Sequence, residues 1–146
     1  DADAMAEAYF RQYEARARVR EVDIVGHFDL LTEFDEEWTC FDPDSPRFRA
    51  AATDAMDLLI AAGKIFEINT GAISRGYRTT PYPSETLLRE LFARGAKVTI
   101  SADAHRTQDV AFDYAQAEAL ARRCGYREAW QFSKTGFVAV PLDETV

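Results

Sequence analysis

The chain has 146 residues, of which 47% are hydrophobic and 29% are charged, and its formal net charge is −8. This length and composition are typical of a single globular domain. The negative charge argues against non-specific binding to nucleic acid or to anionic membranes. No apolar run in the sequence approaches the roughly 20 residues that a membrane-spanning helix needs.

The chain has two cysteines, Cys40 and Cys124, which lie far apart in the sequence and form no CxxC pair. Two free thiols in a reducing cytoplasm are therefore favoured over a disulfide. The chain opens with an alanine-rich acidic segment that has neither an initiator methionine nor the pattern of a signal peptide. We expect a cytoplasmic protein, and the helix-like start suggests a piece of a longer one.

Helix and strand patterns alternate along the chain. Residues 4–19 predict a helix, 22–25 predict a short strand, and the acidic, proline-containing segment 32–48 predicts a long functional loop. The elements expected after it are a helix over 48–63, a strand over 64–69, a helix over 84–95 from Ser84 as N-cap to Gly95 as C-cap, a strand over 97–101, a helix over 109–125, and two short strands over 128–133 and 136–142. This alternation predicts an α/β fold with a parallel sheet, because parallel neighbours need a crossover.

Polar segments follow three of the predicted strands. GHFDL comes after Val25, NTGAISRGYRTTPYP after Ile68 and SADAH after Ile100, and both histidines of the chain, His27 and His105, fall in this set. The carboxyl ends of parallel strands meet at one edge of an open sheet or barrel, where ligands bind. We therefore expect these segments to share a site.

Asp103 and His105 are two residues apart, so in extended backbone they project to the same side. A carboxylate oxygen and an imidazole nitrogen suit Zn²⁺, Mn²⁺ or Fe²⁺, and His27 is placed equivalently after another strand. The pattern predicts a metal site. The alternative, a DxH sequence that is only a hydrogen-bonded loop, stays open.

Arg75 and Arg78 lie in a glycine-punctuated loop between a predicted strand and a helix. Guanidinium groups clamp phosphate with paired hydrogen bonds, although two solvated surface arginines would give the same pattern. Metal ions and arginines together would suit the hydrolysis of a phosphate monoester, because both stabilise charge that develops on phosphoryl oxygens.

These segments carry a family resemblance. GHFDL, FEINTGAISRGYRTTPYPS, VTISADAH followed by QDV, and the closing GFVAVPL resemble the carboxyl-terminal half of the polymerase-and-histidinol-phosphatase (PHP) superfamily, and within it the PHP-type histidinol-phosphatases. The resemblance extends from about Asp23 onward. It implies part of a distorted (β/α)7 TIM-like barrel, roughly its C-terminal half, around a trinuclear site of Zn, Mn or Fe. It also implies hydrolysis of L-histidinol phosphate to L-histidinol and phosphate in histidine biosynthesis.

The resemblance also implies roles for single residues. His27 matches the ligand of the family's GH motif, and Asp103 and His105 match the DxH pair that binds two different metals of the catalytic centre. Arg75 and Arg78 fall where the family has arginines that contact phosphate, and which of the two does so stays open.

Two acidic residues are expected to support the ligands. Asp29 is placed where it would hold the His27 imidazole, and Glu67 where it would orient loop groups by hydrogen bonds.

The family's HxH motif, a further histidine and a bridging glutamate do not occur in this sequence. Residues 1–146 would then be the C-terminal part of one PHP domain, inactive alone and completed by an N-terminal half or by a second copy. Two alternatives remain: a PHP phosphoesterase for another small phosphate ester or nucleotide, and a non-catalytic half-barrel that acts as an interaction module.

Overall fold

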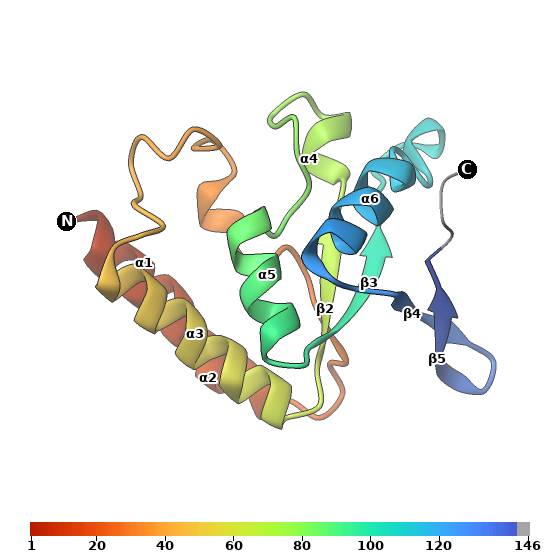
Figure 1. Ribbon diagram of the computed structural model, residues 1–146, viewed down its shortest axis with the longest axis horizontal. Helices are drawn as coiled ribbons and strands as arrows, with labels where there is room; N and C mark the ends of the chain where they lie inside the picture. The colour runs from red at the N-terminus through yellow and green to blue at the C-terminus, as the bar shows by residue number, and fades with distance from the viewer. Residues whose placement is uncertain (143–146) are drawn as a thin grey trace.

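The computed structural model describes residues 1–142 and contains a three-stranded parallel sheet in the order β1-β2-β3 (Figure 1). The strands are β1 (Ile24–Val25), β2 (Ile65–Asn69) and β3 (Lys97–Ser101). The parallel α/β sheet predicted from the sequence is confirmed for these strands. All three carboxyl ends point to one edge, the edge on which the site residues lie.

The helical segments connect these strands. In chain order they are α1 (Ala2–Arg11), α2 (Tyr13–Ala17), the 3-10 turn η1 (Leu30–Thr32), α3 (Pro46–Ala61), α4 (Gly71–Ser74), α5 (Glu85–Ala93), the 3-10 turn η2 (Thr107–Asp109) and α6 (Tyr114–Cys124). The last two strands, β4 (Glu128–Ser133) and β5 (Gly136–Pro141), pair with each other as an antiparallel hairpin that forms a second sheet.

An aromatic cluster ties the N-terminal helices to the sheet. The ring of Phe10 on α1 lies 5.2 Å from that of Phe28 and 5.5 Å from that of Phe48 on α3, and Phe28 lies 5.5 Å from Phe66 on β2. All four rings are buried. Figure 1 shows α1 and α2 running alongside α3. Burial of these large apolar rings supplies much of the force that holds the helices against the sheet.

Two predicted helices have different bounds in the structure. The helix expected over 4–19 is broken at Gln12, whose N–H bonds to the Tyr9 carbonyl and tightens the turn between α1 and α2. The helix expected over 109–125 begins only at Tyr114. Asp113 before it has a φ of 53°, a left-handed conformation that a right-handed helix cannot contain.

The strand expected over 22–25 is shorter, because the Val22 carbonyl accepts a hydrogen bond from the buried Lys64 side chain instead of from a strand. The helix expected from residue 48 starts earlier, with Pro46 in its first turn and the Ser45 hydroxyl capping it. The predicted loop therefore ends before residue 46.

The predicted caps of α5 are confirmed in part. Gly95 follows the helix with a φ of 76°, as a left-handed C-terminal glycine should. Ser84 stands at the N-cap, but its hydroxyl makes no capping bond. Cys40 and Cys124 are free thiols, as predicted. Within residues 1–142 no helix has both the length and the apolar character needed to cross a membrane.

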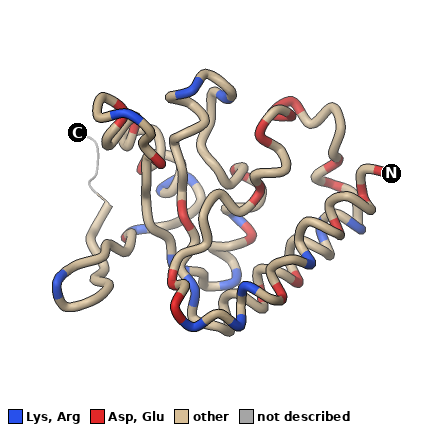
Figure 2. The backbone as a smooth tube through the Cα atoms, turned by 180° about the vertical axis from the view of Figure 1, so that it is seen from behind, with Lys and Arg blue, Asp and Glu red and all other residues tan. Residues whose placement is uncertain are grey.

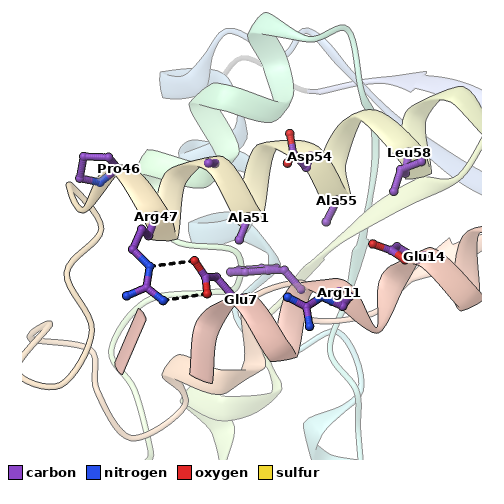
Figure 3. A pocket seen from close by; sticks show the side chains of 11 residues that line it. Glu7, Arg11, Glu14, Pro46, Arg47, Ala51, Asp54, Ala55 and Leu58 are labelled. Carbon is purple, nitrogen blue, oxygen red and sulfur yellow. Dashed lines mark hydrogen bonds and ion pairs between the residues drawn. The ribbon is translucent and has the colours of Figure 1, made fainter. Parts of the chain in front are cut away.

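A hollow of about 400 Å³ lies between α1 and α3, away from the carboxyl ends of the strands (Figure 3). Arg47 crosses it and donates two hydrogen bonds of 2.8 Å to the Glu7 carboxylate. The lining residues carry no buried polar atom without a partner. This hollow is therefore accounted for by the packing of two helices.

Candidate functional site

Arg75, Asp103 and His105 come together at the carboxyl edge of the sheet. Arg75 follows α4, and its guanidinium lies 3.6 Å from the Asp103 carboxylate and 3.2 Å from the His105 Nδ1 atom. The side chains of Arg75 and Asp103 are 25% and 35% exposed. The loop after β2 thus reaches the end of β3 and leaves its charged groups accessible to a ligand.

The His105 ring is oriented by the backbone. Its Nδ1 atom lies 2.8 Å from the Asp103 carbonyl oxygen, closer than to Arg75. A carbonyl only accepts, so in the tautomer with the proton on Nδ1 this contact is a hydrogen bond and the Nε2 lone pair is left for a ligand. In that tautomer His105 presents Nε2 to a metal ion.

Gly71 permits the approach of α4 to the end of β3. A Cβ at this position would lie 2.9 Å from the Ala102 carbonyl oxygen and 3.0 Å from the Asp103 Cβ. The Gly71 amide donates a 2.8 Å hydrogen bond to the Asn69 side chain at the end of β2. Only glycine fits this contact without displacing the backbone that carries Asp103.

Glu67 joins the ends of β1 and β2. One oxygen of its carboxylate accepts hydrogen bonds of 2.9 Å from the His27 backbone N–H and from the Asn69 side-chain amide. Because Asn69 in turn binds Gly71, a continuous chain of hydrogen bonds runs from His27 to α4. Glu67 therefore fixes the position of the His27 backbone.

Both strand-end residues His27 and Asp103 have positive φ angles, 26° and 45° respectively. Non-glycine residues seldom adopt this region, and such strain is concentrated at functional sites. The hydrogen bond to Glu67 and the contact with Gly71 hold these two residues in place.

A buried polar layer lies below the exposed cluster. Arg78 is only 6% exposed, and its guanidinium donates to the Thr32 carbonyl and hydroxyl and lies 4.6 Å from the centre of the Tyr82 ring. Arg78 therefore connects the segment around Thr32 to the segment around Tyr82. Arg75 is the arginine that the structure leaves accessible to a phosphate.

Asp29 is fully buried, and it accepts a hydrogen bond of 2.9 Å from the Ser84 amide. Burial raises the pKa of Asp29, although the Ser84 hydrogen bond and the charge of Arg78 oppose this. Within the described residues its other oxygen has no partner. The Asp29 carboxylate thus bonds to the start of α5 and not to the His27 imidazole.

A lip that sequence reasoning did not predict stands beside the cluster. It consists of Phe34 and Glu36 from the loop after β1, and of Tyr77, Thr79 and Thr80 from the loop after α4. Both Glu36 oxygens accept hydrogen bonds from the two threonines, the shortest being 2.6 Å from the Thr80 hydroxyl. Burial opposes the ionisation of Glu36, but these hydrogen bonds outweigh it and lower its pKa. The only sequence signal for the lip was the length and acidity of its first loop.

Figure 2 shows acidic positions on the loop after β1 and basic positions on the neighbouring loop that contains α4. The acidic residues of the first loop are Glu33, Asp35, Glu36, Glu37, Asp42 and Asp44. The loop after β1 therefore carries negative charge, and the loop that contains α4 carries Arg75 and Arg78.

His27, Asp103 and His105 offer the nitrogen and oxygen donors that transition metals prefer. In residues 1–142, however, no group of three or more His, Cys, Asp and Glu side chains is arranged to hold a metal ion. The donor types fit a metal centre, but their number within this part of the chain falls short of a complete one.

No family model matches the chain. Two curated proteins named "Probable histidinol-phosphatase" are similar to it. The protein from Schizosaccharomyces pombe is 31% identical over 125 residues, which cover 80% of this chain and 38% of that protein. The protein from Deinococcus radiodurans is 30% identical over 122 residues, which cover 82% of this chain and 42% of that protein. The chain thus spans well under half the length of these relatives.

Proposed function

The chain is related to the PHP-type histidinol-phosphatases, and from this premise we propose that it forms part of a phosphatase that hydrolyses L-histidinol phosphate to L-histidinol and phosphate. The cluster of Arg75, Asp103 and His105 at the carboxyl edge of the sheet is the observation that carries the proposal. It combines an accessible guanidinium with a carboxylate and an imidazole, groups that can bind a phosphate ester and assist its hydrolysis.

Arg75 binds the phosphate in this proposal. Its guanidinium is partly exposed, and its contact with Asp103 is loose at 3.6 Å. An incoming phosphate can therefore take its N–H groups as a pair of charge-assisted hydrogen bonds. Arg78 is proposed to be a support and not a phosphate ligand, since it is 6% exposed and its Nη1 group already donates to Thr32.

His27, Asp103 and His105 are proposed to be ligands of a divalent metal centre whose remaining ligands lie outside the described residues. Bound Zn²⁺, Mn²⁺ or Fe²⁺ would supply hydroxide near neutral pH and would offset the charge on the phosphate. The chain's own contribution is to orient these donors. The Asp103 carbonyl fixes the ring of His105, and Glu67 fixes the backbone of His27.

The sheet is proposed to be part of a PHP barrel that another segment or a second copy completes. β1 has two residues and stands at one edge of the sheet. Val19 and Val22 before it and Ile24 within it are 41%, 44% and 38% exposed and line a hollow together with Tyr13. An exposed apolar strand edge invites the pairing of a further strand.

The test is an assay of the complete polypeptide, expressed from its full coding sequence. Phosphate release from L-histidinol phosphate is compared with release from nucleoside monophosphates, before and after treatment with a chelator, and metal content is measured in parallel. We expect release from L-histidinol phosphate that disappears with the metal, and Asp103→Ala and His105→Ala variants that contain less metal. A metal-free protein that releases phosphate from none of these esters would refute the proposal.

A further inference from the structure

Phe34 and Tyr77 form an exposed aromatic pair beside the charged cluster. Their ring centroids lie 5.2 Å apart with an interplanar angle of 70°, an edge-to-face arrangement. Phe34 is 77% exposed and Tyr77 is 48% exposed. The two rings come from different loops, one after β1 and one after α4, so the pair joins the two loops beside Arg75.

Hydrogen bonds hold the two loops that carry this pair in place. Glu36, two residues after Phe34, binds the backbone and hydroxyl groups of Thr79 and Thr80, which follow Tyr77 closely. Asp35 accepts hydrogen bonds from the amides of Cys40 and Phe41 and fixes the rest of its loop. Aromatic rings that are held rigidly and left uncovered by the fold are suited to contact a ligand at low entropic cost.

Arg75 relates the pair to the phosphate site. Its guanidinium carbon lies 6.0 Å from the centre of the Tyr77 ring, and the same guanidinium contacts Asp103 and His105. A ligand whose phosphate is bound by Arg75 therefore lies close to the exposed Phe34–Tyr77 pair.

We propose that Phe34 and Tyr77 form a subsite that binds the planar ring of the substrate and so selects ring-bearing phosphate monoesters over ringless ones. The inference rests on the proposed phosphatase function and adds the residues that set its specificity. An imidazole ring stacks on aromatic faces when neutral and gains cation–π attraction when protonated. The acidic loop that carries Phe34 further favours a protonated ring.

The experiment measures kcat/KM of the complete polypeptide for two esters. L-histidinol phosphate has the ring, whereas 2-aminoethyl phosphate has the amine and the phosphate without it. We expect Phe34→Ala and Tyr77→Ala each to lower the preference for the ring-bearing ester about fivefold, the worth of one aromatic contact, mainly through KM. Tyr77→Phe keeps the ring and should keep the preference.

Phe132 supplies a matched control. It is also 77% exposed and pairs with Phe137 at 5.3 Å, but on the β4–β5 hairpin. Phe132→Ala should leave both kcat/KM values unchanged. Because Phe34 is mostly exposed, its removal should also leave the melting temperature unchanged, which separates loss of the subsite from loss of the fold.

The outcomes distinguish this inference from the proposed function. If both esters are hydrolysed and Phe34→Ala and Tyr77→Ala retain the original preference, the proposed subsite is wrong and the proposed phosphatase function is unaffected. If the unmodified protein has no preference for the ring, the subsite is wrong as well. If neither ester is hydrolysed, both proposals fall together.

Discussion

The guanidinium of Arg75 lies 3.6 Å from the carboxylate of Asp103, although the two residues are 28 positions apart in the chain and follow different strands. Two features bring them together: the parallel pairing of β2 with β3, which aligns the ends of the strands, and the close approach of Gly71 to the backbone before Asp103. The site is thus built by backbone contacts, and its side chains converge as a consequence.

Gly71→Ala tests this backbone contact. A methyl group 2.9 Å from the Ala102 carbonyl oxygen forces α4 away from β3. We expect a loss of about 1–3 kcal/mol in the free energy of unfolding and a marked fall in phosphatase activity. Gly95→Ala is the comparison, because nothing lies within 4 Å of its added Cβ and only its φ of 76° opposes the side chain, so it should lose stability but keep activity. Denaturant unfolding and activity of the complete polypeptide are the measurements, and a Gly71→Ala protein with unchanged activity would contradict the account.

Arg78→Ala is expected to act on stability. It leaves the buried Thr32 carbonyl and hydroxyl without their donor and removes the contact with Tyr82. The expected loss in the free energy of unfolding is about 2–3 kcal/mol. Thermal unfolding measures it, with the exposed Arg49→Ala variant as control. Unchanged stability together with a large rise in KM would instead assign Arg78 to the phosphate.

Asp35→Asn tests the anchor of the acidic loop through pH. Burial opposes the ionisation of Asp35, but hydrogen bonds from Thr39, Phe41 and Cys40 outweigh it and lower its pKa. A carboxyl whose pKa is lower in the folded state stabilises above its unfolded pKa, and the stabilisation is lost as pH falls through the folded pKa. At pH 7 the variant should be less stable by about 1–3 kcal/mol.

The difference between the two proteins should shrink as the pH falls below about 4, near the unfolded pKa of aspartate. Urea unfolding of both proteins between pH 3 and pH 7 follows this difference. A gap that stays constant over the whole range would show that the charge of Asp35 contributes nothing.

Much of the fold followed from local pattern. The strands β2 and β3, the C-terminal glycine of α5 and the last two strands each depend on a few neighbouring residues, so their sequences predicted them, whereas the antiparallel pairing of β4 with β5 was not predicted. The late start of α6 depends on the left-handed conformation of Asp113, and the short helix α4 occupies a segment for which the sequence predicts a loop. Neither leaves a hydrophobic period in the sequence.

The candidate site could likewise be predicted only in part. The placement of His27, Asp103 and His105 after strand ends was predictable, because the parallel topology brings the carboxyl ends of the strands to one edge of the sheet. The burial of Arg78 could not be predicted, since it depends on Thr32, 46 residues away. The lip formed with Glu36 and Thr79 likewise depends on a contact between residues 43 positions apart. Long-range polar contacts of this kind have no periodic signal.

The exposed edge at β1 predicts how residues 1–146 behave when expressed alone. We expect association that increases with concentration, because the apolar edge is left to pair with another chain. Ile24→Lys should increase the fraction of monomer, whereas Met5→Lys, which is exposed on α1, should not. Analytical ultracentrifugation measures this, and a stable monomer at all concentrations would argue against a missing neighbour.

The central claim is that Arg75 binds the phosphate of a substrate beside a metal centre, and it is tested most directly by kcat/KM and metal stoichiometry measured together. For Arg75→Ala in the complete polypeptide, we expect kcat/KM for L-histidinol phosphate to fall by about 10²–10³-fold, as when an oxyanion donor is removed. Arg75→Lys should also lose activity, because it keeps the charge but not the planar fork. Metal content should stay unchanged, since arginine is not a ligand. Near-normal turnover by Arg75→Ala would contradict the account.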